Sequence, residues 1–339
     1  MSLPPTDAIV APPADDALGV LTATSSVVRA ARLVRLDRAA IDALADRWAA
    51  EPWPEQAGLD ALHFTDGTER TVNWVLLLDA LNFCFWPDPG QLRWRVEWRD
   101  QILDGYAALA AALTRAIEEG RPLWDAAYLA DLDAAEMRAI LRPIPGAPAI
   151  PLFDARLANA REAGGVLLAR YDGQFARAVE SAHGSAVALV LPLARDFPSF
   201  HDVATWQGHS VPFLKRAQIC VADLHAAFQG QSWGTFHDLD RLTAFADYKL
   251  PQLLRRYGVL VYAPDLAATV DSYTLIPAGS ESEIEIRAAT IWAVELLRRA
   301  LARRGILRTP SAIDYRLWAD SQAKTPDERP YHRTRTIYY

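Results

Sequence analysis

The sequence predicts a mainly α-helical protein with few short strands. Apolar residues recur at helical spacing along most of the 339 residues, and residues 259–262 carry the clearest strand signal. With 51% hydrophobic residues, the chain can bury a sizeable core. We expect a single globular helical domain over residues 18–339, after a flexible Pro- and Ala-rich segment over residues 1–17. The Pro-rich residues 144–151 are a candidate internal link within that domain.

Helical periodicity defines the predicted elements of the first half of the chain. One helix is expected over residues 33–48. Another is expected over residues 71–86, which are apolar nearly all round and therefore buried on most faces. Pro87 and Pro89 follow this second helix and are expected to end it. Further helices with the same periodicity are predicted over residues 99–119, 125–130, 133–141, 152–162 and 166–183.

The helical pattern continues in the second half. Residues 211–228 place an apolar stripe on one face of a helix, with Lys215 and Gln218 on the neighbouring face. Residues 238–246 predict a further helical turn or two.

Two later helices are marked by their ends. Pro251 suits the first position of a short helix that Gly258 stops. Ser282 and Glu285 form a capping-box pattern at the start of a long helix that ends at Gly305.

Composition limits the class of protein. A net charge of -7 and a pI near 5.5 argue against a broad nucleic-acid footprint, which needs a basic face. Cys84 and Cys220 fall in apolar helical segments and are typical of buried thiols in a reducing compartment. The start of the chain lacks the features of a signal peptide, and no apolar window of about 18 residues predicts a membrane span. We therefore expect a soluble cytoplasmic protein.

Motifs for metals and cofactors are weak in this chain. His201 with Asp202, and His237 with Asp238, resemble the paired ligands of metal-dependent phosphohydrolases, but further ligands at helix spacing are not found. The sequence has no glycine-rich phosphate loop, serine nucleophile elbow or dinucleotide fingerprint. We therefore expect neither a metal nor a cofactor.

Lysine usage singles out two positions. The chain has 32 arginines and three lysines, of which Lys324 lies in a polar C-terminal stretch. Lys215 and Lys249 instead lie in apolar, helix-patterned sequence. Arg cannot replace Lys where a compact charge with a tunable pKa is required. Chance alone would also leave a few lysines in a chain of this composition.

An acidic residue lies next to the second of these lysines. Asp247 precedes the helix that contains Pro251, so its carboxylate can face the unpaired N–H groups of that helix, which favours the ionised form. An ionised carboxylate in a dry pocket suits a reaction that develops positive charge, such as cleavage at the anomeric carbon of a sugar. The alternative is an ordinary helix cap, which Asp favours.

Several segments together resemble the queuosine salvage protein family, in order and over most of the chain from about residue 30. They are DALNFCFWPD (79–88), FPSFHD (197–202), FLKRAQICVADL (213–224), LTAFADYKLPQLLRRYG (242–258), EIEIRAATIWAVELL (283–297) and IDYRLWA (313–319). The resemblance implies hydrolysis of the bond between ribose and a 7-deazaguanine base in queuosine 5′-monophosphate, releasing queuine. It also implies an all-helical fold similar to that of helix-hairpin-helix DNA glycosylases.

The resemblance implies the catalytic residues as well. The family's essential Asp falls on Asp247 and its essential Lys on Lys215. Asp247 would then stabilise the oxocarbenium-like ribose, or orient and deprotonate the attacking water. Lys215 would keep Asp247 ionised or contact the ribose phosphate.

Residues that recognise the base are expected around these two. Asp202 is our candidate for the two adjacent N–H donors of a guanine-like edge, with Phe200 or His201 stacking on the base. The alternative for this segment is a rigid turn started by Pro198. Asn82 and Phe83 could close the other side of the pocket, or could simply pack in the core with an internal hydrogen bond.

Four further residues are candidates for substrate binding. Tyr248 adjoins Asp247 in the chain, and Glu285 could meet the amine and diol of queuine, although it doubles as the capping-box acid. Trp318 and Asp314 are weaker candidates. Two other functions stay open: a non-catalytic queuine- or nucleoside-binding protein, and a DNA-repair glycosylase, which the acidic balance disfavours.

Overall fold

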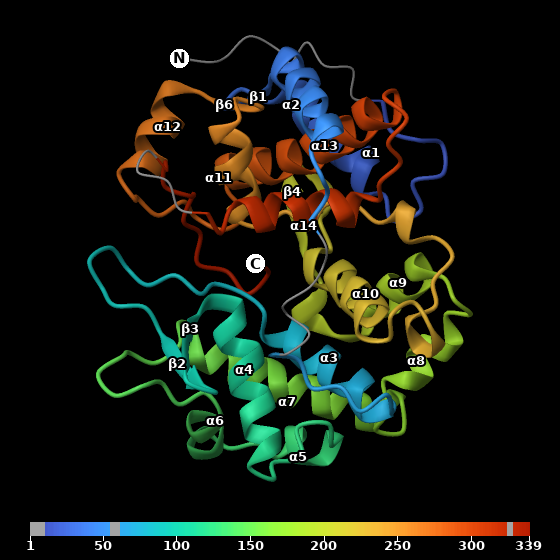
Figure 1. The fold of residues 1–339 in the computed structure, drawn as a ribbon, viewed down its shortest axis with the longest axis vertical. Coiled ribbons are helices and arrows are strands. Elements are labelled where there is room, and N and C mark those ends of the chain that lie inside the picture. The colour runs from blue at the N-terminus through green and yellow to red at the C-terminus, as the bar shows by residue number, and fades with distance from the viewer. Residues whose placement is uncertain (1–10, 55–61, 324–327) are drawn as a thin grey trace. The chain divides into compact units, whose positions relative to one another are not determined.

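The computed structural model describes residues 11–54, 62–323 and 328–339, and in them the chain is mainly helical with a few short strands (Figure 1). This confirms the predicted fold class. The chain divides into two compact units, each considered separately. Unit 1 comprises Met1–Glu55, Asp202–Gln218 and Asp238–Thr336, and unit 2 comprises Gln56–His201, Ile219–His237 and Ile337–Tyr339.

Unit 1 is built around one long helix, α13 (Glu281–Ala302), on which every residue from 283 to 297 is buried. A helix buried on all faces must satisfy its polar side chains from within the protein. Helices α1, α2, α11 and α14 pack against it (Figure 1). The helices of this unit besides α13 are α1 (Val20–Ala30), α2 (Arg38–Ala50), η4 (Leu239–Arg241), α11 (Lys249–Arg256), α12 (Pro264–Asp271) and α14 (Pro310–Asp320).

Two antiparallel strand pairs complete the described part of unit 1. They join β1 (Val34–Leu36) to β6 (Leu260–Tyr262), and β4 (Val203–Trp206) to β5 (His209–Pro212). The strand predicted over residues 259–262 is confirmed. The helix predicted over residues 33–48 is wrong at its start, because residues 34–36 pair with β6. Helix α2 begins only after Asp37, whose carboxylate accepts the Ala40 N–H at 3.0 Å.

Unit 2 is also helical. Its described elements are α3 (Glu69–Leu81), β2 (Arg95–Trp98), β3 (Gln101–Asp104), α4 (Gly105–Glu118), α5 (Ala126–Ala130), α6 (Ala134–Ile140), α7 (Phe153–Arg170), α8 (Ala176–Ser181), α9 (Ala186–Asp196), η2 (Pro198–Phe200) and η3 (Ser232–Gly234). Helix α10 (Lys215–Ala227) has its first four residues in unit 1 and the others in unit 2. The short helices predicted over residues 125–130 and 133–141 are confirmed as α5 and α6.

Helix α7 runs without a break through Gly164 and Gly165, where two separate helices were predicted. A Cβ at Gly164 would lie 2.4 Å from the Ala130 nitrogen and 2.5 Å from the Ala126 oxygen. The glycine therefore lets α5 approach the backbone of α7 closely, and its role is packing rather than termination.

Hairpins replace the first turns of two predicted helices. Residues 99–119 and 211–228 were predicted as helical, but β3 and β5 occupy their starts. Each hairpin closes with a two-residue loop in which both residues have positive φ: Arg99 and Asp100 (47° and 61°), and Gln207 and Gly208 (48° and 81°). This loop type matches the twist of paired strands.

Two predicted helix ends are also corrected. Helix α3 ends at Leu81 rather than at residue 86, well before Pro87. The cap of α13 is Ser280, whose hydroxyl accepts the Glu283 N–H at 3.4 Å, while Glu283 accepts the Gly279 N–H at 2.6 Å. The capping pair therefore lies two residues before the predicted Ser282 and Glu285, and Glu285 is released for another role.

Other predictions concern segments rather than elements. Only residues 239–241 of the stretch 238–246 are helical, and α11 starts at Lys249 with Pro251 in its first turn. Residues 144–151 lie inside unit 2 and do not separate the two units. Of the predicted flexible segment 1–17, residues 1–10 lie outside the described residues. One domain over residues 18–339 stays a prediction.

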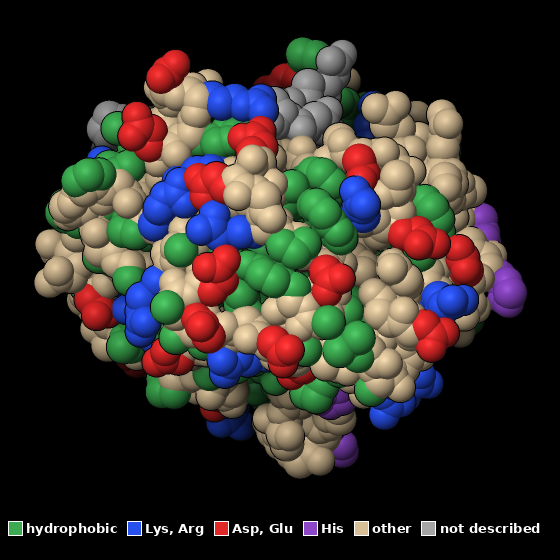
Figure 2. Space-filling model, turned by 90° about the horizontal axis from the view of Figure 1, so that it is seen from below, with side chains coloured by type: hydrophobic (Ala, Val, Ile, Leu, Met, Phe, Trp, Pro, Cys, Tyr) green, Lys and Arg blue, Asp and Glu red, His purple; other side chains and the backbone are tan. Residues whose placement is uncertain are grey.

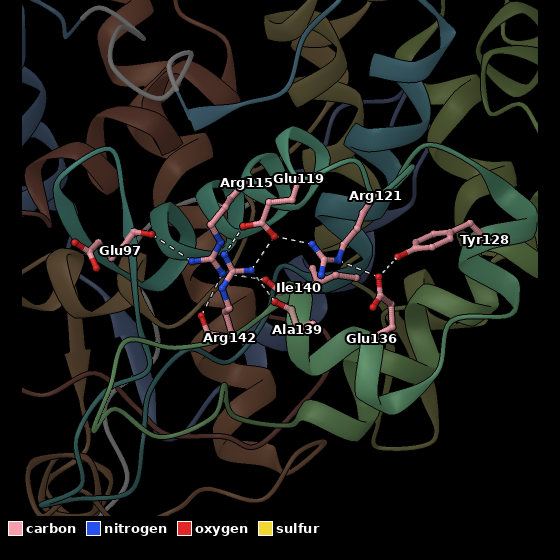
Figure 3. Close-up of polar contacts among 9 residues, drawn as sticks. All are labelled: Glu97, Arg115, Glu119, Arg121, Tyr128, Glu136, Ala139, Ile140 and Arg142. Carbon is pink, nitrogen blue, oxygen red and sulfur yellow. Dashed lines mark hydrogen bonds and ion pairs between the residues drawn. The ribbon is translucent and has the colours of Figure 1, made fainter.

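Surface charge is mixed on the one face that Figure 2 shows. There, basic and acidic side chains are interspersed with apolar and uncharged ones. In unit 2, Glu119 binds both Arg121 and Arg142, and Arg121 also binds Glu136, which accepts the Tyr128 hydroxyl (Figure 3).

Among the described helices, none is long and apolar enough to cross a membrane.

Candidate functional site

Asp247 lies in unit 1, between η4 and α11, with its side chain partly exposed. Its Oδ1 accepts the backbone N–H groups of Lys249 at 2.8 Å and Leu250 at 2.9 Å, so the carboxylate caps the first turn of α11. The capping role that the sequence allowed is therefore present. The two bonds fix the orientation of the carboxyl group, and Oδ2 takes no part in them.

The protonation of Asp247 is set by opposing effects. Burial of the carboxyl group is the largest and raises its pKa above the usual range, while the positive charge of Lys215 and the two N–H groups oppose it. The sequence argument expected the ionised form to be favoured. The two expected influences are present, but desolvation outweighs them.

Lys215 is the first residue of α10 and is 6% exposed. Its backbone N–H donates to Asp202 Oδ2 at 3.1 Å. Its ammonium charge acts on Asp247 and on a second carboxylate, Asp314, and lowers the pKa of each. The structure therefore brings Lys215 and Asp247 into electrostatic contact within one unit.

Asp314 lies on α14 and is buried. Its Oδ2 accepts the Phe245 N–H at 2.7 Å, which ties α14 to the segment just before Asp247. Burial raises the pKa of Asp314 well above its usual range, and the negative charge of Asp247 raises it further. Sequence reasoning ranked this residue low, because only its burial beside a second carboxylate makes it chemically distinctive.

We call Asp247, Lys215 and Asp314 the Asp247 cluster. When two carboxyl groups interact and one is more deeply buried, their titrations separate. The pKa of Asp314 is raised further above its usual value than that of Asp247, because Asp314 is buried and the charge of Asp247 adds to the effect. Such a pair can supply an acid and an anion to one reaction, and Lys215 balances the charge.

Asp202 is committed to the fold. Its two oxygens accept a pair of hydrogen bonds from Arg287 at 2.9 and 2.6 Å, and both side chains are 2% exposed. One oxygen also accepts the Lys215 N–H. A base edge would have to displace these partners from a buried carboxylate, which argues against the predicted role of Asp202 in base recognition.

Four of the predicted substrate-binding residues belong to unit 2. Phe200 is fully buried against Phe197, with ring centroids 5.9 Å apart, and the exposed His201 has Nδ1 3.1 Å from the Ala194 oxygen. Asn82 donates to Asp79 at 3.4 Å, and the Phe83 ring is 4.3 Å from the Arg156 guanidinium. The alternative of core packing with an internal hydrogen bond therefore describes Asn82 and Phe83.

The other three lie in unit 1. Glu285 is fully buried and accepts the backbone N–H groups of Arg32, Leu33 and Val34 at 2.7–3.1 Å, so its carboxylate fastens α13 to β1 rather than facing a ligand. Tyr248 is partly exposed beside Tyr331, with ring centroids 4.9 Å apart. Trp318 is partly exposed and stacks on Tyr315 at 5.9 Å.

Metal ligands are not gathered in the described residues. No group of three or more His, Cys, Asp or Glu side chains there could hold a metal ion. His201 and His237, singled out with the acidic residues that follow them, are both in unit 2, while Asp202 and Asp238 are in unit 1.

Comparison with known proteins adds the family. The sequence model of the queuosine salvage protein family matches residues 62–339. A protein of Sphaerobacter thermophilus is 49% identical over 324 residues, covering 96% of this chain and 98% of that protein. A mouse protein (Mus musculus) is 34% identical over 335 residues, covering 96% of each, and one from Schizosaccharomyces pombe is 35% identical over 298 residues, covering 82% and 86%. All three are named queuosine 5′-phosphate N-glycosylase/hydrolase. With two thirds and more of its length matched, the chain belongs to the queuosine salvage protein family.

Proposed function

We propose that this protein hydrolyses the N-glycosidic bond of queuosine 5′-monophosphate and releases queuine and ribose 5-phosphate, so that queuine can be reinserted into tRNA. The names of the relatives support the reaction. The observation that carries the chemistry is the Asp247 cluster, in which an oriented carboxyl group is under the electrostatic influence of a buried lysine and of a buried carboxyl group whose pKa is raised well above its usual range.

Asp247 is the proposed partner of the sugar. Cleavage of the bond leaves positive charge on the ribose, and a carboxylate already held in place can stabilise that charge without reorganising. Because Oδ1 is engaged with α11, we assign Oδ2 to the anomeric carbon or to the attacking water. Lys215 lowers the pKa of Asp247 and thereby raises the fraction that is ionised.

The leaving base is the difficult half of the reaction. A 7-deazapurine has carbon in place of N7, so its departure must be assisted at N3, O6 or the exocyclic edge. As the C–N bond breaks, its electron pair stays on the base, and the base needs a proton. We assign that proton to Asp314, because burial and the negative charge of Asp247 raise the pKa of its carboxyl group well above the usual range. Water supplies the hydroxyl group that the anomeric carbon gains.

Three broader expectations belong to this proposal. We infer that the substrate is a free mononucleotide rather than a nucleic acid, which the net charge of -7 and the mixed surface charge support. We place the protein in the cytoplasm, which the buried thiols of Cys84 and Cys220 support. We also retain the likeness of its helical fold to helix-hairpin-helix DNA glycosylases, which superposition on such enzymes would test.

One incubation tests the reaction. Purified protein is mixed with queuosine 5′-monophosphate, and free queuine and ribose 5-phosphate are measured by mass spectrometry. We expect both products in equal amounts, with and without a chelator. Binding of the nucleotide without release of either product would favour a non-catalytic binding protein instead.

A further inference from the structure

The buried pair formed by Asp202 and Arg287 contacts both halves of the proposed catalytic machinery. On one side, Asp202 accepts the Lys215 N–H through Oδ2, and its backbone carbonyl accepts the N–H groups of Phe213 and Leu214 at 2.9 and 3.1 Å. The hairpin of β4 and β5 starts directly after Asp202, so the chain returns to it and α10 begins there.

On the other side, Arg287 reaches the segment of Asp247. Its Nε donates to the carbonyl of Ala246, the residue that precedes Asp247, at 3.2 Å. Its guanidinium group lies 4.0 Å from the centre of the Phe213 ring, two residues before Lys215. Arg287 itself is held by α13, the helix on which every neighbouring residue is buried.

We infer that the Asp202–Arg287 pair is a positioning device, which sets the placement of Lys215 relative to Asp247 rather than binding substrate. The inference rests on the proposed function only for its effect on turnover. One ion pair joins the backbone of Lys215 to the backbone next to Asp247, through bonds of 3.1 and 3.2 Å at its two ends. A small shift of either end would change the separation of the lysine and the carboxylate.

The charges around the pair show why Arg287 is required. Asp202 lies beside Lys215, and without Arg287 its carboxylate would compete with Asp247 for the lysine. Glu283, at 3.7 Å, adds a second negative charge near Arg287, and His332 faces it as a neutral side chain because burial and Arg287 lower its pKa to about 3. Among the described residues, the charged groups that act on Asp247 are Lys215, Lys249 and Asp314.

The test replaces the pair without leaving a buried charge. Single variants of a buried ion pair often fail to fold, whereas exchange of both partners for apolar residues of similar volume is often neutral for stability. The variant is therefore Arg287→Met with Asp202→Leu, accepted for assay once its thermal unfolding is cooperative. The matched control exchanges another two-bond pair of unit 1, Arg255→Met with Asp271→Asn, whose bonds of 2.7 and 3.0 Å contact neither Lys215 nor Asp247.

The first readout is turnover and its dependence on pH. We expect kcat to fall about 10- to 100-fold, as misplacement of a catalytic group by roughly 1 Å does, with KM changed less than about threefold. The acid limb of the pH–rate profile should move to higher pH, because Asp247 loses the lysine that favours its charged form. The control should keep the wild-type kcat and acid limb.

A second readout needs no substrate. The chain has three lysines, so selective ¹⁵N labelling gives three side-chain amine signals, and Lys215→Arg identifies the one of interest. The pH dependence of that signal reports the titration of Asp247 and Asp314. We expect its midpoint to rise in the paired variant and to stay in the control. A folded variant with wild-type kcat, or with an unchanged Lys215 midpoint, would overturn the inference. If the wild-type protein releases no queuine, the proposed function fails, and the Lys215 midpoint alone decides on positioning.

Discussion

Two groups of carboxylates in this protein lie near cations, and their pKa values are shifted in opposite directions. In unit 2, Glu119 lies among Arg115, Arg121 and Arg142, and their charges and hydrogen bonds lower its pKa (Figure 3). In unit 1, Asp247 and Asp314 have Lys215 beside them, yet burial raises both pKa values. Proximity to cations does not by itself decide how the pKa of a carboxyl group shifts; its balance with the loss of water around the group does. A carboxyl group that must exchange a proton near neutral pH therefore belongs in a buried setting like that of unit 1.

The largest effect is expected from Asp247→Asn. Asparagine keeps an oxygen that can cap α11, so the fold should persist, while the charge that stabilises the ribose is lost. We expect kcat to fall at least about 100-fold, or roughly 2.7 kcal/mol of transition-state stabilisation. Turnover of queuosine 5′-monophosphate is the measurement. Glu119→Gln serves as the control, since it removes a carboxylate from the solvated network and should leave kcat unchanged.

Asp314→Asn tests the second carboxyl group. The proposed acid must be protonated and the proposed anion ionised. Wild-type activity should therefore decline at pH values below the pKa of Asp247 and at pH values above the raised pKa of Asp314. The variant should lose about 100-fold in kcat, the lower end of what general acid catalysis contributes, and should lose the alkaline limb of its profile. An alkaline limb that persists in the variant would assign the acid to another group.

Lys215→Met removes the cation that both carboxyl groups share. The pKa of Asp247 should rise, so the acid limb should shift to higher pH and kcat should fall most at pH values on that limb. Raising the pH of the assay should restore part of the lost kcat. If the acid limb stays where it is in the wild-type protein, Lys215 does not act through Asp247.

Sequence reasoning reached part of this arrangement. Asp247 and Lys215 could be found, because an acidic residue before a proline-marked helix and a rare lysine in apolar sequence are visible in one dimension. Arg287 could not, since nothing distinguishes it among 32 arginines until the fold places it beside Asp202 and Ala246. Asp314 became prominent only when its burial next to Asp247 was known.

For the fold as well, features set within one segment could be predicted, whereas features set by residues far along the chain could not. Helical periodicity predicted the mainly helical class, because a buried face repeats within a single segment. It failed at residues 33–36, where the partner strand β6 lies far along the chain. It also failed at Arg99 and Asp100, whose positive φ values no glycine or asparagine announces. The cap of α13 lies two residues before the predicted one because Ser280 and Ser282 each precede a glutamate by three residues, and only packing chooses between them.

A variant of His332 can test whether a buried titratable group also makes the unfolding free energy depend on pH. Its pKa is about 3 in the folded protein, below the usual 6.5, so between these values the unfolded chain binds a proton that the folded chain does not. Stability from this residue is therefore present above pH 6.5 and is lost as the pH falls towards 3, at about 1.4 kcal/mol per pH unit. When the pH is lowered from 6.5 to 4.5, the wild-type protein should lose roughly 2 kcal/mol of unfolding free energy through His332. The His332→Gln variant should not show this part of the loss, as measured by urea unfolding at both pH values.

The smallest effect is expected where the comparison began, in the solvated network of unit 2. Glu119→Gln removes the acceptor that Arg121 and Arg142 share, but all three side chains are 23–44% exposed and water can replace the lost bonds. We expect the unfolding free energy to change by less than about 1 kcal/mol, and by less still in 1 M salt, where exposed charges are screened. Asp202→Asn offers the buried counterpart, because it leaves Arg287 without its charged partner and should cost about 3–5 kcal/mol regardless of salt. Equal and equally salt-sensitive losses in the two variants would mean that burial does not separate the two groups of carboxylates.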